Sequence, residues 1–142
     1  MQRWLLLAYN VPREPTANRV SVWRKLKRLG AVLLNDAAWA LPATAQTAEQ
    51  LQWLATEIKE LDGTCTLWKA ELLEGDERAL IEQFAAQLEQ PYREILAALK
   101  RKDPDLPALS RRYQLLQSQD YFRSPLSQRV QDALVAKGAS SK

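Results

Sequence analysis

The residues of this sequence that are best suited to chemistry are six cations in its first third. They are Arg13, Arg19, Arg24, Lys25, Lys27 and Arg28. Glu14 is the one acidic residue between positions 13 and 28, so the local charge of this segment is +5. An arginine guanidinium can grip a phosphate through two parallel hydrogen bonds, whereas a lysine acts as a mobile point charge. The cluster therefore favours contact with the phosphates of a nucleic acid, which supplies affinity but reads little sequence.

The same segment has a plainer interpretation as a packed helix with a solvated side. Its apolar residues recur at helical spacing, at Val22, Trp23, Leu26 and Leu29. This spacing predicts one buried side, with Trp23 in the core rather than available for stacking on a base. Arg24, Lys25 and Arg28 fall on the other side, where water alone would satisfy them. The residues by themselves leave both interpretations open.

Most other chemistry is excluded by composition. The sequence has no histidine and one cysteine, Cys65. A Ser-His-Asp triad, a histidine-bound metal and an internal disulfide are therefore excluded. An enzyme would have to use carboxylates, lysine, tyrosine or the lone thiol. We expect a protein without catalytic activity, cofactor or metal, in which Cys65 is a small buried residue.

Length and hydropathy indicate a globular protein. The chain has 142 residues, 46% of them hydrophobic, which suits a compact domain. No apolar run approaches the roughly 20 residues of a membrane span. The short apolar run near the start lacks the features of a signal peptide, and cysteine is scarce. We expect a cytoplasmic location and no membrane partner.

The elements expected around the cations alternate between strand and helix. Residues 4–9 predict a strand, and Asn18 is expected to cap a helix that ends before Gly30. Residues 31–41 predict two short strands or one bulged strand, with Asn35-Asp36 at the turn or bulge. Thr47 is expected to cap a second helix, and residues 64–70 alternate like a strand. The order β-α-β-β-α-β predicts an α+β fold with a ferredoxin-like sheet domain over residues 1–72.

The C-terminal half predicts packed helices. Pro91 is expected to break or kink the first of them, and Ser124-Pro125 to open the last. The first strand is apolar on both sides, so the face of the sheet that two helices leave open needs a second cover. We expect residues 73–137 to pack on the sheet domain as a helical extension, followed by a frayed tail at 138–142. A symmetric homodimer is the other candidate for that cover.

Charge is distributed unevenly along the chain. Residues 1–48 hold seven Lys or Arg and two Asp or Glu, a net charge of +5. Residues 49–94 hold four and eleven, a net −7, and residues 95–142 hold nine and four, a net +5. Such asymmetry can guide a polyanion to one face or lead a chain to self-associate, and an ordinary mixed surface also accommodates it.

Three stretches carry a family resemblance. They are WLLLAYNVPREPTANRVSVWRKLKRLGAVLLNDAAWALP at 4–42, EQLQWLATEIKELDGTCTLW at 49–68 and RRYQLLQSQDYFRSP at 111–125. The pattern R-x-x-x-W-R-x-L-K-R-L-G from Arg19 to Gly30, and the acidic-aromatic-aromatic group Asp120, Tyr121 and Phe122, resemble the N-terminal domain of the ChrB chromate-resistance regulators.

The resemblance implies transcriptional control of chromate-efflux genes through promoter DNA. It assigns the phosphate contacts to the basic helix and leaves open whether chromate or another oxyanion is an effector. Members of that family usually carry a further C-terminal domain. The alternative function is a dimeric protein-interaction module that does not bind DNA itself.

A more distant resemblance is to the ferredoxin-like CRISPR adaptation proteins and the matching domain of PaaX-type repressors. These share a strand, an arginine-bearing helix, a glycine and a strand that ends in an aromatic residue, here Trp39. The CRISPR proteins have an Asp near the end of the first strand that is associated with metal and nuclease activity. Asn10 stands there in this sequence, and a neutral amide is a poor ligand for a hard divalent cation. We therefore expect no nuclease activity.

Overall fold

The computed structural model describes residues 2–140 and divides the chain into two compact units, Met1–Glu77 and Arg78–Lys142. The elements of the first unit are β1 (Trp4–Asn10), α1 (Thr16–Leu29), β2 (Val32–Leu34), β3 (Ala38–Pro42), α2 (Ala45–Glu60) and β4 (Thr64–Ala70). They are followed by α3 (Glu77–Leu99), α4 (Leu106–Ser118) and α5 (Pro125–Ser140). The predicted α+β class, with strands early and helices late, is confirmed.

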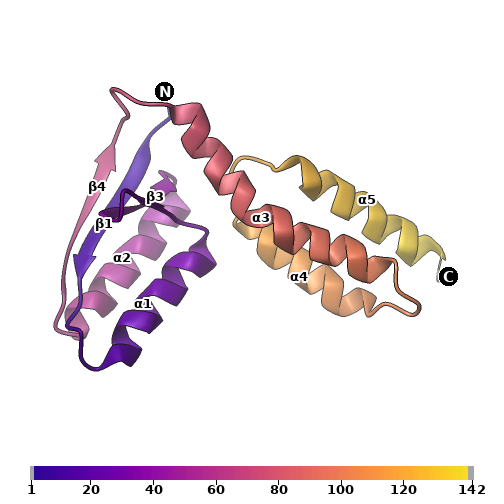
Figure 1. Cartoon of the computed structure of the whole chain (residues 1–142), viewed down its shortest axis with the longest axis horizontal. Coiled ribbons are helices and arrows are strands. Elements are labelled where there is room, and N and C mark those ends of the chain that lie inside the picture. Colours follow the sequence, from indigo (N-terminus) through magenta and orange to yellow (C-terminus); the bar gives the residue numbers. More distant parts are fainter. Residues whose placement is uncertain (1, 141–142) are drawn as a thin grey trace. The chain divides into compact units, whose positions relative to one another are not determined.

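The four strands form one antiparallel sheet in the order β2-β3-β1-β4. Leu6 of β1 lies opposite Ala40 of β3 and Trp68 of β4. Figure 1 shows α1 and α2 side by side against this sheet. This is the ferredoxin-like arrangement that the alternation of strands and helices predicts.

Two left-handed residues explain the connection between β2 and β3. Asn35 and Asp36 have φ angles of 49° and 57°, which Asn and Asp tolerate better than most residues, and they lie in a three-residue turn between Leu34 and Ala38. Of the two predicted alternatives for 31–41, two strands joined at Asn35-Asp36 is the correct one. Gly30, with φ of 83°, ends α1 as predicted.

Both predicted helix caps are displaced. α1 begins at Thr16 after Pro15, with no capping bond from a side chain, so Asn18 lies inside its first turn and is not the N-cap. At α2, the capping residue is Thr44, whose Oγ1 accepts from the Thr47 amide at 3.0 Å while the Thr47 hydroxyl accepts from the Thr44 amide at 2.9 Å. Thr47 is thus the third helical residue of a capping box. Its buried hydroxyl also donates to the Pro42 carbonyl at 2.7 Å, which ties α2 to the end of β3.

The core of the first unit lies between the helices and one face of the sheet. The sheet contributes Leu5, Leu7, Trp39 and Leu41, and the helices contribute Val22, Leu26, Leu51, Leu54 and Ile58. Side chains alternate along a strand and recur every three to four residues along a helix, so each element turns one apolar row inward. Of the predicted apolar row of α1, Val22 and Leu26 are buried, Leu29 is half-buried and Trp23 is exposed.

The other face of the sheet is covered only in part. Trp4 is 3% exposed, and its indole N–H donates to the Glu77 carboxylate at 3.0 Å. Trp68 lies on the same face in β4 and is 60% exposed. In the single chain this face is therefore open at Trp68 on the edge strand, and its cover by a second copy stays a prediction. The packing of the C-terminal helices on this sheet remains a prediction.

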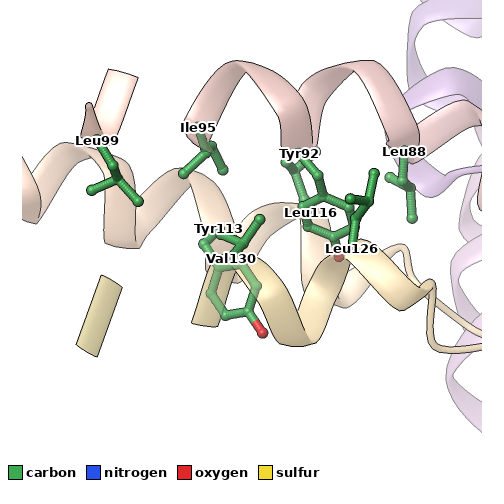
Figure 2. Close-up of a cluster of buried hydrophobic side chains, with 8 residues drawn as sticks. All are labelled: Leu88, Tyr92, Ile95, Leu99, Tyr113, Leu116, Leu126 and Val130. Atoms are coloured by element: carbon green, nitrogen blue, oxygen red, sulfur yellow. The ribbon is translucent and has the colours of Figure 1, made fainter. Parts of the chain in front are cut away.

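The second unit has a core of its own. Eight side chains from α3, α4 and α5 point toward one another in Figure 2: Leu88, Tyr92, Ile95, Leu99, Tyr113, Leu116, Leu126 and Val130. α3 continues from Glu77 to Leu99 through Pro91, so of the predicted break or kink at this residue the break is wrong. The apolar row of α3 runs from Phe84 before the proline to Ile95 beyond it, and burying this row outweighs the hydrogen bond that Pro91 cannot make.

The segment between α4 and α5 closes this bundle. The rings of Tyr121 and Phe122 lie with their centroids 6.4 Å and 5.6 Å from that of Phe84, in edge-to-face contacts. These contacts hold the segment between α4 and α5 against α3. α5 begins at Pro125 as expected and continues through Gly138 to Ser140, past the predicted start of the tail. Residues 141–142 lie outside the described residues. Within residues 2–140, none of the helices combines the length and the apolar character that a membrane span requires.

Candidate nucleic-acid interface

α1 separates its cations into two rows. Residues four apart share a side of a helix, so Arg19 and Lys27 align with Trp23, and Arg24 aligns with Arg28. All four of these cations are exposed, and their apolar neighbours Val22 and Leu26 are buried. The remaining cation outside the helix, Arg13, is exposed in the loop that precedes it.

The row of Arg24 and Arg28 consists of two cations without an aromatic residue between them. No ion pair or hydrogen bond engages either guanidinium within residues 2–140. Two unpaired guanidinium groups one helical turn apart can each present parallel N–H donors to a phosphate. This is the part of the predicted cluster that the structure leaves most available to a ligand.

Lys25 is engaged within the protein. Its ammonium pairs with the Glu57 carboxylate of α2, and both side chains are about two-fifths exposed, at 41% each. An exposed pair of this kind contributes about 0–1 kcal/mol to stability, but it removes one positive charge from the surface. The +5 of the segment therefore overstates what α1 offers to a polyanion.

Trp23 is the main error in the predicted core. Its side chain is 50% exposed, and the Lys27 ammonium lies over its ring, 6.0 Å from the centroid. Neighbouring residues point about 100° apart around a helix, so Trp23 sits at the border of the side that buries Val22. The apolar spacing is correct, but within residues 2–140 the packing leaves half of this side chain uncovered. Trp53 of α2 is exposed as well, at 67%.

An open groove of about 640 Å³ lies beside Trp23. β1, β2, β3, α1 and the loops that join them line it, with three aromatic rings and three charged groups. The aromatic residues are Tyr9, Trp23 and Trp39, and the charged ones are Arg13, Arg19 and Asp36. Two guanidinium groups against one carboxylate leave the groove with a positive charge. Asn10 lines it as well, at the end of β1.

The Tyr9 hydroxyl interacts with both the Trp39 indole and the charge of Arg19. Burial raises the pKa of the Tyr9 hydroxyl, and the Trp39 indole and the charge of Arg19 offset that rise only in part. The phenol is therefore neutral at pH 7, and its hydroxyl can donate a hydrogen bond. Arg13 and Arg19 form no ion pair within the described residues.

The predicted site residues thus fall into two groups. Arg13 and Arg19 line the groove, whereas Arg24 and Arg28 lie on the outer side of α1. The aromatic and polar lining was missed as a binding surface, because Tyr9, Trp39 and Asp36 come from separate strands and turns. The sequence gives no signal that these three residues line one groove, beyond the clustering of aromatic and basic residues in the first 40 positions.

The comparisons with known proteins agree with the resemblance of the basic segment. A family model described as "Protein ChrB, N-terminal" matches residues 19–106, which include most of α1 and continue into the second unit. The chain is also 34% identical, over 82 residues, to the Protein ChrB of Cupriavidus metallidurans. That match covers 58% of this chain but only 25% of the relative.

The chain therefore corresponds to about a quarter of the length of that relative. No solved structure has a significant match to the chain. The family match includes Arg19, Arg24, Lys25, Lys27 and Arg28, and it begins after β1 and Arg13. Because it extends over more than half of the residues, the chain belongs to the family of the ChrB N-terminal domain.

Proposed function

We propose that this chain is a non-enzymatic DNA-binding regulator of chromate-resistance genes, in which α1 contacts the phosphates of promoter DNA. The observation that carries the proposal is the row of Arg24 and Arg28, exposed and free of ion pairs within the described residues. Membership of the ChrB N-terminal family supports the regulatory role. The link to chromate follows from the resemblance to that family of regulators.

Electrostatics determine what α1 can contribute. A cation that neutralises a phosphate releases a counterion, so affinity falls as salt rises, with a log–log slope of about −0.9 for each contact. Such contacts position a protein on DNA without specifying sequence. α1 therefore accounts for affinity and orientation, and base reading requires other residues.

The test measures binding of the chain to a fluorescent duplex from the region upstream of its gene, over a salt series. The double variant Arg24→Ala/Arg28→Ala should bind more weakly, and its log–log slope should flatten by about 2 units, one for each lost contact. Both side chains lie off the buried side of α1, so the melting curve should be unchanged.

The matched control is Arg78→Ala/Arg93→Ala, which removes the same charge from side chains paired with Glu82 and Glu89. This variant should keep the slope within about half a unit of the original, because both guanidinium groups are already paired with carboxylates. Equal affinity and slope for the Arg24/Arg28 variant and the original chain, with an intact fold, would show that these cations are merely solvated. Absence of binding to any duplex would favour the alternative of a protein-interaction module.

A further inference from the structure

The groove beside α1 has a composition that phosphate contacts along a helix do not require. Its volume of about 640 Å³ lies in the range of small-molecule sites, roughly 300–1,000 Å³. A bare oxyanion would need the guanidinium groups of Arg13 and Arg19 but no aromatic wall. A purely apolar ligand would need the wall but not the cations. A ligand that satisfies both has a flat apolar part and a negative charge next to it.

We propose that this groove binds one unpaired nucleotide, with its base against Trp23 and its phosphate at Arg13 and Arg19. The inference rests on the proposed function, because the strand that α1 holds is the expected source of the nucleotide. The base would leave the duplex, as bases do when proteins read or stack on them singly.

Trp23 has the properties of a stacking platform. It lines the groove and is half exposed. The Lys27 ammonium contacts the Trp23 ring, but Lys27 does not line the groove and so does not occupy the space for a ligand. An aromatic face left in water forgoes part of its burial free energy, so a ligand that covers it recovers free energy. Base-on-aromatic stacking is tolerant of sequence, since every base has a π face.

The groove also offers polar groups for the edge and backbone of a nucleotide. The Asn10 amide can both donate and accept, the Asp36 carboxylate can accept from an exocyclic amine, and the Tyr9 hydroxyl can donate. Arg13 and Arg19 have no ion-pair partner among residues 2–140, so a phosphate would not compete with a carboxylate for them. Asp36, as the one acidic lining residue, belongs on the side of the base rather than of the phosphate.

The experiment compares three ligands: a fully paired duplex, the same duplex with a single bulged 2-aminopurine, and free 2-aminopurine deoxynucleoside monophosphate. Affinity is followed by anisotropy of an end label on each duplex. Stacking is followed by quenching of the 2-aminopurine fluorescence, which also reports on the free nucleotide. The full chain should bind the bulged duplex about tenfold more tightly than the paired one, which corresponds to ~1.4 kcal/mol.

Three variants separate the groove from the rest of the surface. Trp23→Ala should reduce the ratio of the two affinities to about one and abolish the quenching. Trp23→Phe keeps a ring and should keep most of the ratio. Trp53→Ala removes another exposed indole, from α2 and outside the groove, and should change neither quantity. Melting curves of all three variants check that the fold is retained.

The outcomes distinguish this inference from the proposed function. Duplex binding that depends on Arg24 and Arg28, with no gain from the bulge or with a gain that survives Trp23→Ala, would overturn the nucleotide site and leave the proposed function standing. If neither duplex binds, the proposed function fails. Quenching of the free nucleotide that Trp23→Ala abolishes would then still support a nucleotide site, and its absence would overturn the inference as well.

Discussion

Tyr92 is the largest fully buried side chain of the chain's described part, and its hydroxyl is paired inside the second unit. It donates to Asp120 Oδ2 at 2.9 Å, and Asp120 Oδ1 accepts the Ser124 amide at 2.8 Å. Burial raises the pKa of Tyr92 well above its usual value of 10.0; Ser127 acts in the opposite direction, and Asp120 adds to the rise. One carboxylate thus holds a core hydroxyl and the start of α5 together.

This pair predicts sensitivity to alkaline pH. The unfolded chain ionises Tyr92 near pH 10, before the folded protein does, so its contribution to stability is complete below about pH 10 and is lost as pH rises through the folded pKa. Tyr92→Phe should lower the free energy of unfolding at pH 7 by about 1 kcal/mol, because Asp120 loses a donor. The variant should also lose less stability than the original between pH 9 and about pH 11. Urea unfolding at a series of pH values measures both effects, and parallel curves for the two proteins would refute the assignment.

Single residues also show how far the sequence can predict a site. Arg24 and Arg28 are exposed as predicted, because their positions relative to the buried side of α1 follow from helical geometry alone. The ion pair of Lys25 with Glu57 joins residues that are 32 positions apart. The sequence around either residue does not predict that contact.

At the scale of helices and strands, the turn from α2 into β4 leaves no room for a side chain at Gly63. A Cβ added at Gly63 would lie 2.6 Å from the carbonyl oxygen of Asn10 and 2.9 Å from Ile58 Cγ2. The first of these neighbours is backbone, at the end of β1, and cannot move without shifting the strand. Gly138 in α5 differs, because an added Cβ there meets nothing within 4 Å.

The two glycines therefore predict opposite effects of the same substitution. Gly63→Ala should reduce the free energy of unfolding by about 1–3 kcal/mol, as overpacking does in cores. Gly138→Ala should raise it by up to about 1 kcal/mol, because alanine favours a helix over glycine. Chemical denaturation of each variant measures the difference. Equal stabilities of the two variants would mean that the end of β1 shifts at little cost. The position of Asn10 in the groove would then be less well fixed.

The types of elements were more predictable than their ends. Periodicity predicts every strand and helix of the first unit, since a buried row recurs every two residues in a strand and every three to four in a helix. The cap of α2 is at Thr44 rather than Thr47 because both threonines can accept an amide hydrogen bond, whereas α1 begins after Pro15 with no side-chain cap. The connection of Thr47 to Pro42 shows that tertiary contacts select among them.

For the chain as a whole, the division into two units changes how the charge pattern is understood. Residues 1–77 hold nine Lys or Arg and ten Asp or Glu, a net charge of −1, and residues 78–142 hold eleven and seven, a net +4. The acidic middle third crosses the boundary between them. The positive surface of α1 is therefore local to that helix and does not extend over its unit, so its effect on DNA should fall off steeply with salt.

The two units also predict different behaviour when they are separated. Residues 78–142 contain their own cluster of eight buried side chains and should melt cooperatively. Residues 1–77 carry Trp4, Leu6 and Trp68 on the face of the sheet that α1 and α2 do not cover. Each large apolar side chain left in water forgoes about 1.5–3 kcal/mol, so this fragment should aggregate or unfold in part unless it dimerises.

Thermal melting, a dye that binds exposed apolar surface and sedimentation of each fragment measure these expectations. A monomeric fragment 1–77 that melts cooperatively would show that the sheet needs neither the helices nor a second copy. A stable dimer of that fragment would instead support the symmetric cover of the open face.

The sequence by itself determined the order and type of the elements, the ferredoxin-like pairing they permit, the exposed cations of α1 and the family to which the chain is related. These follow from local propensity and periodicity, which fix how each side chain points relative to its own helix or strand. The tertiary structure alone decided that Trp23 and Trp68 stay accessible, that Glu57 engages Lys25, and that Tyr9, Arg19 and Asp36 share one groove. Exposure and proximity depend on which distant segments come to lie over a residue, and periodicity within a single element does not encode that information.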